Sequence, residues 1–172
     1  SMISSLRTMG NGFLIKGCDF GFNRSRGILI KASNGELLNN KLTHCWMEAI
    51  KVSPEAWWKE SGCSDNVVIK GNIINDCGTG IAVYAHGPNG KIMECGAHNN
   101  ISIIDNRISG SFLPNIFVSS TDGLTASGNV LVGPRPAAQG TPWWKRHLEY
   151  WQVDSENLDA VMTLKCRNMS GI

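Results

Sequence analysis

One short segment recurs four times along the chain, and this recurrence limits the folds that are open to the sequence. Each copy is a strand-like run of alternating residues that ends in an asparagine. The four terminal asparagines are Asn40, Asn72, Asn106 and Asn129. They are 32, 34 and 23 residues apart, and a looser copy ends in Cys18, 22 residues before the first. A second short strand follows about ten residues after the end of most copies, at 27–30, 49–52, 80–83 and 115–118.

This spacing is typical of a parallel β-helix, in which a coil of 22–23 residues carries two or three short strands. Stacked coils lie roughly 4.8 Å apart, so equivalent residues fall above one another. An inward asparagine at one corner can then bond to the backbone and to the asparagine of the next coil. An antiparallel sandwich also has short strands and glycine-rich turns. It gives no reason for asparagine to recur in register, so the sequence predicts an all-β parallel β-helix of about five coils.

Composition agrees with a single β-rich domain and excludes several partners. The chain has 172 residues, 42% of them hydrophobic, and 19 glycines for tight turns. Its net charge is +2 with no basic block, so no nucleic-acid partner is predicted. No run of roughly eighteen apolar residues occurs, so no membrane partner is predicted either. The start, Ser1-Met2, resembles an expression scar, and the protein is expected to be secreted or periplasmic with its targeting segment absent.

The predicted organisation has three parts. Residues 1–11 are interpreted as a tag remnant and lead-in, 12–133 as the β-helix coils, and 134–172 as a C-terminal cap. The cap is predicted to hold a short helix at 141–151, with Thr141 as a capping residue, and a late strand at 160–164. The first coil has little to cover its open end. We therefore expect a missing upstream domain or a homo-oligomer to cover it, and interpret the chain as the C-terminal part of a larger protein.

The cysteines allow more than one interpretation. Cys45 and Cys77 each follow a repeat asparagine by five residues, so they are expected to stack in adjacent coils. They are interpreted either as buried thiols or as a disulfide. Cys63 and Cys95 lie near two histidines, but their spacing matches no zinc pattern. No metal and no cofactor are predicted.

Two insertions are the predicted location of function. Residues 53–65 lengthen one coil and residues 86–99 lengthen the next, and both follow the equivalent strand. Both should therefore leave the β-helix at the same edge and form the wall of a groove. Functional residues concentrate on such loops above a rigid scaffold.

The first insertion has the residue types of a sugar site. It contains Glu55, Trp57, Trp58, Lys59 and Glu60 within six positions. Aromatic rings offer flat apolar faces to pyranose rings, and charged groups bind hydroxyls. The alternative is that the tryptophans only attach the loop to the sheet. Upstream, Arg26 is expected either to bind substrate or to form a surface ion pair.

Glycoside hydrolysis generally needs two carboxyl groups across the scissile bond. Besides Glu55 and Glu60, the candidates are Glu48, directly before the strand 49–52, and Glu94 in the second insertion. Each of these carboxylates has the alternative role of a solvated surface group.

Several of these segments together resemble one known family. They are 23–29 through Asn39-Asn40, Glu48-Ala49-Ile50, Trp58-Lys59-Glu60-Ser61-Gly62 and 66–72. This pattern resembles the right-handed β-helix of the bacterial α-1,3-galactosidases, inverting and metal-independent glycoside hydrolases of the pectate-lyase-like superfamily. The likeness covers about 11–78 well and 79–132 only as generic β-helix, and its moderately specific element is Trp58-Lys59-Glu60-Ser61-Gly62. It implies a right-handed β-helix. It also implies that Glu60, which matches the family motif directly, acts as an acid, a base or a ligand to a sugar hydroxyl.

The chain departs from this family at two places. The family's paired aspartates lie upstream of the matched region, and no Asp-Asp pair occurs here. Ser53-Pro54 stands where the family tends to have Gly-Asp. The resemblance therefore implies a carbohydrate-active ancestor, while the second carboxylate is left open between Glu48 and an upstream aspartate.

The leading hypothesis is an α-galactosidase-like glycoside hydrolase, or the C-terminal part of one, that binds an oligosaccharide or polysaccharide. Glu60 and Glu48 would be catalytic, and the binding residues would be Trp57, Trp58, Glu55, Lys59 and Arg26. The alternative is a non-catalytic glycan-binding or tailspike-type module that uses the same groove. A third hypothesis is a polysaccharide lyase or epimerase, which normally needs a more cationic site than this groove shows. A pure scaffold role is also open, since fold alone does not set function.

Overall fold

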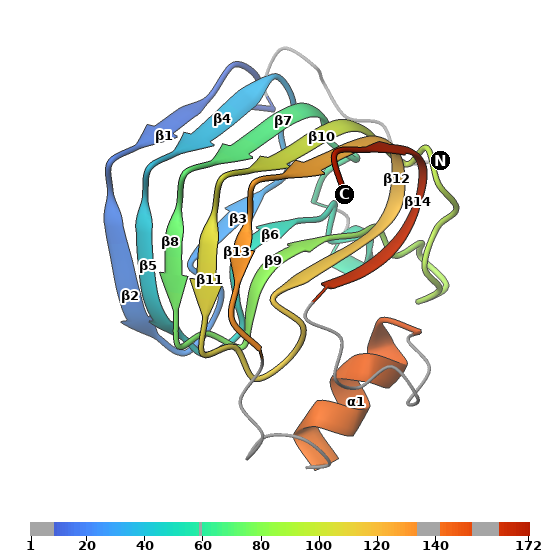
Figure 1. Ribbon diagram of the computed structural model, residues 1–172. Helices are drawn as coiled ribbons and strands as arrows, with labels where there is room; N and C mark the ends of the chain where they lie inside the picture. The colour runs from blue at the N-terminus through green and yellow to red at the C-terminus, as the bar shows by residue number, and fades with distance from the viewer. Residues whose placement is uncertain (1–8, 59, 134–141, 153–161) are drawn as a thin grey trace.

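The computed structural model describes residues 9–58, 60–133, 142–152 and 162–172. The chain winds through successive coils, and equivalent short strands of successive coils pair side by side into sheets (Figure 1). The first coil holds β1 (Leu14–Lys16), β2 (Asp19–Asn23) and β3 (Ile28–Ile30). The second holds β4 (Gly35–Leu38), β5 (Lys41–Cys45) and β6 (Glu48–Val52).

The later coils repeat this order with a longer strand at the end. The third coil holds β7 (Asp65–Lys70), β8 (Ile73–Asn75) and β9 (Thr79–Val83). The fourth holds β10 (His98–Ile104) and β11 (Arg107–Ser109), and runs into β12 (Ile116–Ser127). β12 continues around the next corner into the fifth coil, which ends with β13 (Val130–Leu131).

Strand pairing confirms the parallel β-helix. One sheet has the order β1-β4-β7-β10-β12-β9-β6-β3, because the long strand β12 joins two faces of the coil. The other has the order β13-β11-β8-β5-β2. The pairings between named strands are parallel, for example Ile50 beside both Ile28 and Ile81. An antiparallel sandwich is therefore the wrong alternative.

The predicted asparagine ladder is present inside the coil. The Asn40 side-chain amide and backbone N–H donate to Asn72 Oδ1 at 3.0 and 2.9 Å. The same pair of bonds joins Asn72 to Asn106 and Asn106 to Asn129. Cys18, at the position of the missing asparagine, donates its backbone N–H to Asn40 Oδ1 at 3.0 Å. The ladder satisfies buried amides at the corner, which would otherwise cost free energy.

The interior of the coil is filled by rows of aliphatic side chains in register. Ile28, Ile50, Ile81 and Ile116 form one such row across the four strands β3, β6, β9 and β12. Each is at most 7% exposed, and full burial of such a side chain stabilises the fold by about 1.5–3 kcal/mol.

The stacked cysteines are buried thiols, and a disulfide is not formed. The Cys45 backbone N–H lies 3.4 Å from Cys77 Sγ, and both residues are fully buried. The hydrogen bond between the two thiols and burial raise the pKa of the Cys77 thiol, so it stays protonated. The pair fills the interior as small apolar groups.

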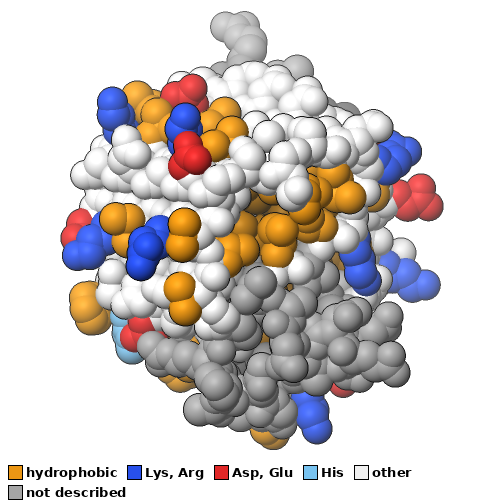
Figure 2. Space-filling model, in the orientation of Figure 1, with side chains coloured by type: hydrophobic (Ala, Val, Ile, Leu, Met, Phe, Trp, Pro, Cys, Tyr) orange, Lys and Arg blue, Asp and Glu red, His pale blue; other side chains and the backbone are white. Residues whose placement is uncertain are grey.

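The C-terminal part contributes a helix and one more strand. α1 (Pro142–Tyr150) lies within the predicted helical segment, and β14 (Met162–Ser170) extends beyond the predicted late strand. β14 pairs in parallel with β12 and so adds to the same sheet. Figure 2, in the orientation of Figure 1, shows hydrophobic side chains gathered near the middle of the face turned to the viewer. Residues 1–8 and 134–141 lie outside the described residues, and the division into lead-in, coils and cap stays a prediction.

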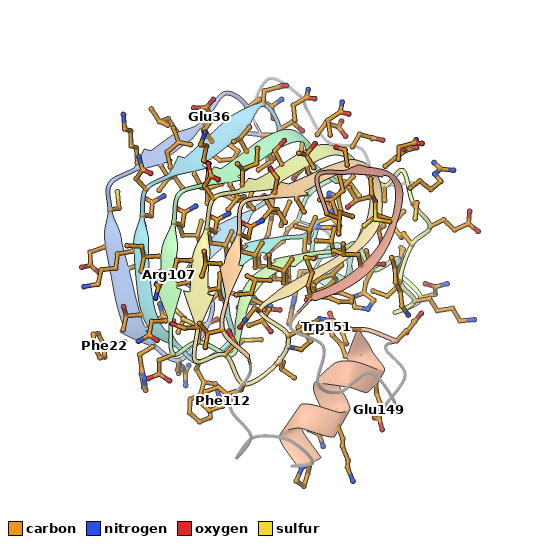
Figure 3. All side chains as sticks on the ribbon, viewed as in Figure 1. Phe22, Glu36, Arg107, Phe112, Glu149 and Trp151 are labelled. Atoms are coloured by element: carbon orange, nitrogen blue, oxygen red, sulfur yellow. The ribbon has the colours of Figure 1, made fainter. Side chains whose placement is uncertain are left out.

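α1 is followed by a side chain that packs on the outer face of the coil. Trp151 is 1% exposed and stacks on Phe117 of β12, with ring centroids 4.4 Å apart and 4° between the planes. Figure 3 labels Trp151 beside α1. Ala82, Tyr84 and Leu113 complete this second, smaller apolar cluster. Within the described residues, no helix has the length and apolar character to cross a membrane.

Candidate functional site

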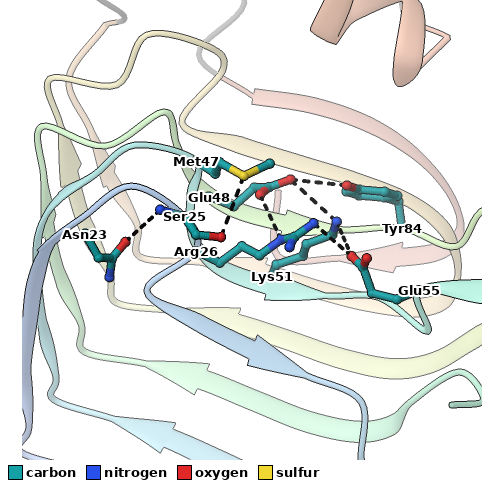
Figure 4. Close-up of polar contacts among 8 residues, drawn as sticks. All are labelled: Asn23, Ser25, Arg26, Met47, Glu48, Lys51, Glu55 and Tyr84. Atoms are coloured by element: carbon teal, nitrogen blue, oxygen red, sulfur yellow. Dashed lines mark hydrogen bonds and ion pairs between the residues drawn. The ribbon is translucent and has the colours of Figure 1, made fainter. Parts of the chain in front are cut away.

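Four charged side chains and a tyrosine converge outside β6 (Figure 4). Glu48 and Lys51 come from β6 itself, Arg26 from the turn before β3, Glu55 from the first insertion, and Tyr84 from the residue after β9. The turn that carries Arg26 is held by a local hydrogen bond, in which the Ser25 N–H donates to Asn23 Oδ1 at 3.2 Å. Strand stacking brings Glu48 and Lys51 of β6 next to Tyr84 after β9, and Glu55 follows shortly after the end of β6.

Lys51 lies at the centre of this group and is 2% exposed. Its Nζ lies 2.5 Å from Glu55 Oε1 and 3.9 Å from Glu48 Oε1. The same nitrogen lies 4.9 Å from the centre of the Tyr84 ring. A buried ammonium is costly unless it is paired, and here two carboxylates and a ring face compensate it.

Glu48 is a buried carboxylate with one fully engaged oxygen and one that is less engaged. The Tyr84 hydroxyl donates to Oε1 at 3.1 Å. Oε2 lies 3.8 Å from Arg26 Nε and accepts no hydrogen bond from the described residues. Since buried polar atoms are usually satisfied, this oxygen is suited to a donor on a ligand.

Glu55 is held in its ionised form. Burial would raise the pKa of this carboxyl group, but the hydrogen bond and charge of Lys51, with Arg26 and Lys31, outweigh it and leave the pKa below the usual value. Arg26 Nη2 lies 3.2 Å from Glu55 Oε1. Glu55 is therefore the permanent counter-charge of the group. Burial and the charge of Glu48 raise the pKa of Tyr84, which keeps its hydroxyl protonated as a donor.

Two cavities adjoin this charged group. The first, of about 260 Å³, is called the insertion cavity and is lined by Arg26, Ser53, Glu55, Ala56, Trp58, His86, Gly87, Gly90 and Tyr150. The second, of about 240 Å³, is called the helix cavity and is lined by Arg26, Met47, Glu48, Lys51, Tyr84, Arg146 and Tyr150. Residues of both predicted insertions thus line the insertion cavity, and α1 contributes to both cavities.

α1 is attached to the second insertion at this place. His86 Nε2 donates to the Tyr150 carbonyl at 2.9 Å, and the two rings are 4.1 Å apart at their centroids. Burial lowers the pKa of His86, so the imidazole is neutral at neutral pH and this hydrogen bond comes from its neutral ring.

The predicted site residues are distributed unevenly over this region. Arg26 lines both cavities, Glu48 lines the helix cavity, and Glu55 lines the insertion cavity. Trp58, in the short helix η1 (Ala56–Trp58), also lines the insertion cavity and is 68% exposed. Trp57 shares η1, but its side chain and the whole of Lys59 lie outside the described part of the chain.

Glu60 contacts none of the four charged side chains of this group. It forms an ion pair with Lys31, its side chain is 49% exposed, and it lines neither cavity. An exposed pair of this kind contributes little to stability. The structure therefore brings Glu48, Glu55 and Arg26 together, but it does not bring Glu60 or Glu94 to them. The catalytic role of Glu60 stays a prediction.

Four residues of this region were not predicted from the sequence: Lys51, Tyr84, Arg146 and Tyr150. Lys51 had a signal, because it is the one charged residue between the apolar residues of the strand 49–52. Tyr84 and Tyr150 are distant in sequence, and no local pattern indicates that their rings lie 6.1 Å apart. Among the described residues, no group of three or more His, Cys, Asp or Glu side chains could hold a metal ion.

Comparison with known proteins gives a family and three relatives. Residues 3–131 match the family described as the right handed beta helix region. Alpha-1,3-galactosidase A of Bacteroides fragilis is 34% identical over 139 residues, which cover 75% of this chain and 23% of that protein. The same enzyme from another strain is 36% identical over 129 residues. Alpha-1,3-galactosidase B of Bacteroides thetaiotaomicron is 30% identical over 128 residues, and no solved structure matches significantly.

The aligned region of this chain spans only 21–23% of the length of these relatives. Arg26, the Glu48 to Glu55 stretch and Tyr84 all lie within the matched residues 3–131, whereas α1 lies beyond them. The stacked parallel coils and the sequence match agree, and the chain belongs to the right-handed β-helix family and is homologous to Bacteroides α-1,3-galactosidases.

Proposed function

We propose that this chain is carbohydrate-active and forms the sugar-binding part of a glycoside hydrolase that acts on α-galactosyl-terminated oligosaccharides. The observation that carries the proposal is Glu48, a buried carboxylate in the wall of the helix cavity with one oxygen that accepts no hydrogen bond from the described residues. The names of the homologous α-1,3-galactosidases support the substrate class. The aromatic residues Trp58 and Tyr150 support a sugar ring as ligand, because they offer apolar faces beside the charged group.

Each residue has a distinct role in this proposal. Glu48 would donate a proton to the glycosidic oxygen, or accept a hydrogen bond from a sugar hydroxyl. Tyr84 and Arg26 would orient its carboxyl group. Glu55, already ionised and paired, would hold Arg26 and Lys51 in position. Trp58 would stack on the sugar in the insertion cavity.

The spacing of the carboxylates bears on the chemistry. The Oε1 atoms of Glu48 and Glu55 lie 3.9 and 2.5 Å from the same lysine nitrogen. These two oxygens therefore lie no farther apart than the lower limit of the roughly 6.5–9.5 Å between the carboxyl groups of inverting enzymes. An inverting reaction would need Glu48 to act with another carboxylate. We propose that this partner is Glu60 or a residue of the longer protein, of which the relatives have about four times the aligned length.

Replacement of Glu48 tests the proposal. Galactose release is measured from α-1,3-galactosyl oligosaccharides, with binding of the same sugars followed by calorimetry. Glu48→Gln should lower turnover by about 100-fold or more, the contribution typical of a general acid or base. The matched control is Glu36→Gln, because Glu36 is an exposed glutamate on the distant strand β4 (Figure 3). Full turnover in Glu48→Gln would contradict the proposed role. Glu60→Gln, measured in parallel, decides whether Glu60 is the second carboxylate.

A non-catalytic glycan-binding module is the second candidate. The close approach of Glu48 and Glu55 to one lysine favours it, because both carboxylates are already engaged by Lys51. Sugar binding without turnover, lost in Trp58→Ala and unchanged in Glu60→Gln, would support the binding module over the enzyme.

A further inference from the structure

One wall of the helix cavity comes from outside the coils. Arg146 and Tyr150 of α1 line this cavity of about 240 Å³ together with Glu48, Lys51 and Arg26. The family match ends at residue 131, so these two side chains lie beyond the part that this chain shares with the family. They can therefore set a ligand preference that the coils alone do not.

Positively charged side chains outnumber negatively charged ones around the helix cavity. Its lining has three cations, Arg26, Lys51 and Arg146, and one carboxylate, Glu48. Arg26 and Lys51 also contact Glu55, which lies on the side of the insertion cavity. Arg146 makes no ion pair with any residue that the structure describes. Its side chain is exposed, and it is the one lining cation without an ion pair to the described residues, so its guanidinium group is free to meet a ligand.

The same cavity offers a second unsatisfied group. Glu48 Oε2 is buried and accepts no hydrogen bond from the described residues, so it can take a hydroxyl donor from a ligand. A ligand anion would be repelled by Glu48 and attracted by Arg146. A ligand that engages both groups would carry a hydroxyl group on one side and a negative charge on another. Met47, Tyr84 and Tyr150 also line the cavity and offer it apolar surface.

We propose that the helix cavity binds a sugar residue with an anionic substituent, a carboxylate or a sulfate, and that Arg146 pairs with this substituent. The inference rests on the proposed function and specifies its substrate class. A guanidinium group donates two parallel N–H bonds to two oxygens of a carboxylate or of a sulfate, so the interaction fixes the orientation of the ligand as well as pairing the charges. The sugar hydroxyl next to the anion binds Glu48, and the tyrosine rings contact the apolar face of the pyranose.

Binding of three matched oligosaccharides tests this inference. The ligands are a neutral α-galactosyl oligosaccharide, the same sugar sulfated on its terminal residue, and the same sugar with a terminal galacturonate. We expect the chain to bind at least one anionic sugar about tenfold more tightly than the neutral one, with a preference that weakens as the salt concentration rises. The sulfated and uronate ligands separate the two sources of negative charge.

Variants of α1 assign the preference to one residue. Arg146→Ala should remove the tenfold preference while neutral-sugar binding is retained, and Arg146→Lys should keep part of it, since a lysine retains the charge but not the two parallel donors. Lys145→Ala is the matched control, because Lys145 is an exposed cation on the same helix and lines neither cavity. It should leave the preference unchanged.

The outcomes separate this inference from the proposed function. Equal affinity for neutral and anionic sugars would overturn the role of Arg146 and leave the sugar site in place. An anion preference that survives in Arg146→Ala, or that is lost equally in Lys145→Ala, would overturn it as well. Failure to bind all three sugars would contradict the proposed function itself.

Discussion

Lys51 shows how single residues shape the candidate site. Its ammonium group is almost completely buried, yet it has Glu55, Glu48 and the Tyr84 ring around it. Removal of one partner from such a group is strongly destabilising, because it leaves an uncompensated buried charge. The group therefore couples the geometry of the site to the stability of the fold, and this coupling depends on pH through Glu55.

We predict that the ionised Glu55 side chain makes an acid-sensitive contribution to the stability of the fold. Its folded-state pKa lies below the ordinary value of 4.5, so its contribution is present above that pH and is lost as the pH falls through the folded-state pKa. Glu55→Gln should lower the free energy of unfolding at pH 7, and the difference from the unmodified protein should shrink below about pH 4.5. Urea unfolding between pH 3 and 7 measures it. Glu36→Gln is the control, and a loss independent of pH would contradict the ionic role.

The asparagine ladder acts at the scale of the elements. Asn72 donates to the Leu37 carbonyl and to Asn106 Oδ1, and accepts from both nitrogens of Asn40. One side chain thus joins three coils at the same corner. A parallel stack of short strands depends on such bonds, because each strand by itself makes few ladder hydrogen bonds.

Asn72→Ala should destabilise the protein by about 3 kcal/mol or more, since each buried polar group left without a partner costs about 1–3 kcal/mol. Thermal and urea unfolding measure the change. The control is Asn66→Gly in the exposed row Asn34, Asn66 and Asn100, where Asn66 has a φ of 55°. Glycine adopts this backbone conformation readily, and the hydrogen bonds lost are exposed to solvent, so the cost should stay below about 1 kcal/mol. Equal losses in the two variants would show that burial of the ladder is not the cause.

At the scale of the whole molecule, two apolar cores hold different parts of the structure. The first fills the coil, and the second, around Trp151, Phe117 and Tyr84, attaches the segment after α1 to the outer face. The helix cavity lies where this attachment meets the charged group. The position of Arg146 and Tyr150 therefore depends on the second core and not on the stacking of the coils.

Trp151→Ala tests this separation. Loss of a buried tryptophan removes about 3–5 kcal/mol of packing, and most of this loss should fall on the attachment of α1. Amide hydrogen exchange in 142–150 should become faster, while exchange in β4, β7 and β10 stays slow. Trp46→Ala is the control, because Trp46 is 56% exposed. Equal acceleration in the coils would show that the two cores unfold together.

The sequence by itself determined the coil, its parallel strands, the asparagine ladder and the stacking of Cys45 on Cys77, while the structure decided that these two are free thiols. These features repeat with the coil, so a regular spacing along the chain becomes a vertical row in space. The tertiary structure alone decided the candidate site. Glu48 could be selected as a carboxylate beside a strand, but its contacts with Arg26 and Tyr84 join three separate coils. Glu60 lies in the same insertion as Glu55, yet it pairs with Lys31, because the path of an irregular loop is set by packing and not by a repeat. The wall formed by α1 follows from contacts between residues more than sixty positions apart, such as His86 and Tyr150, for which no local periodicity exists.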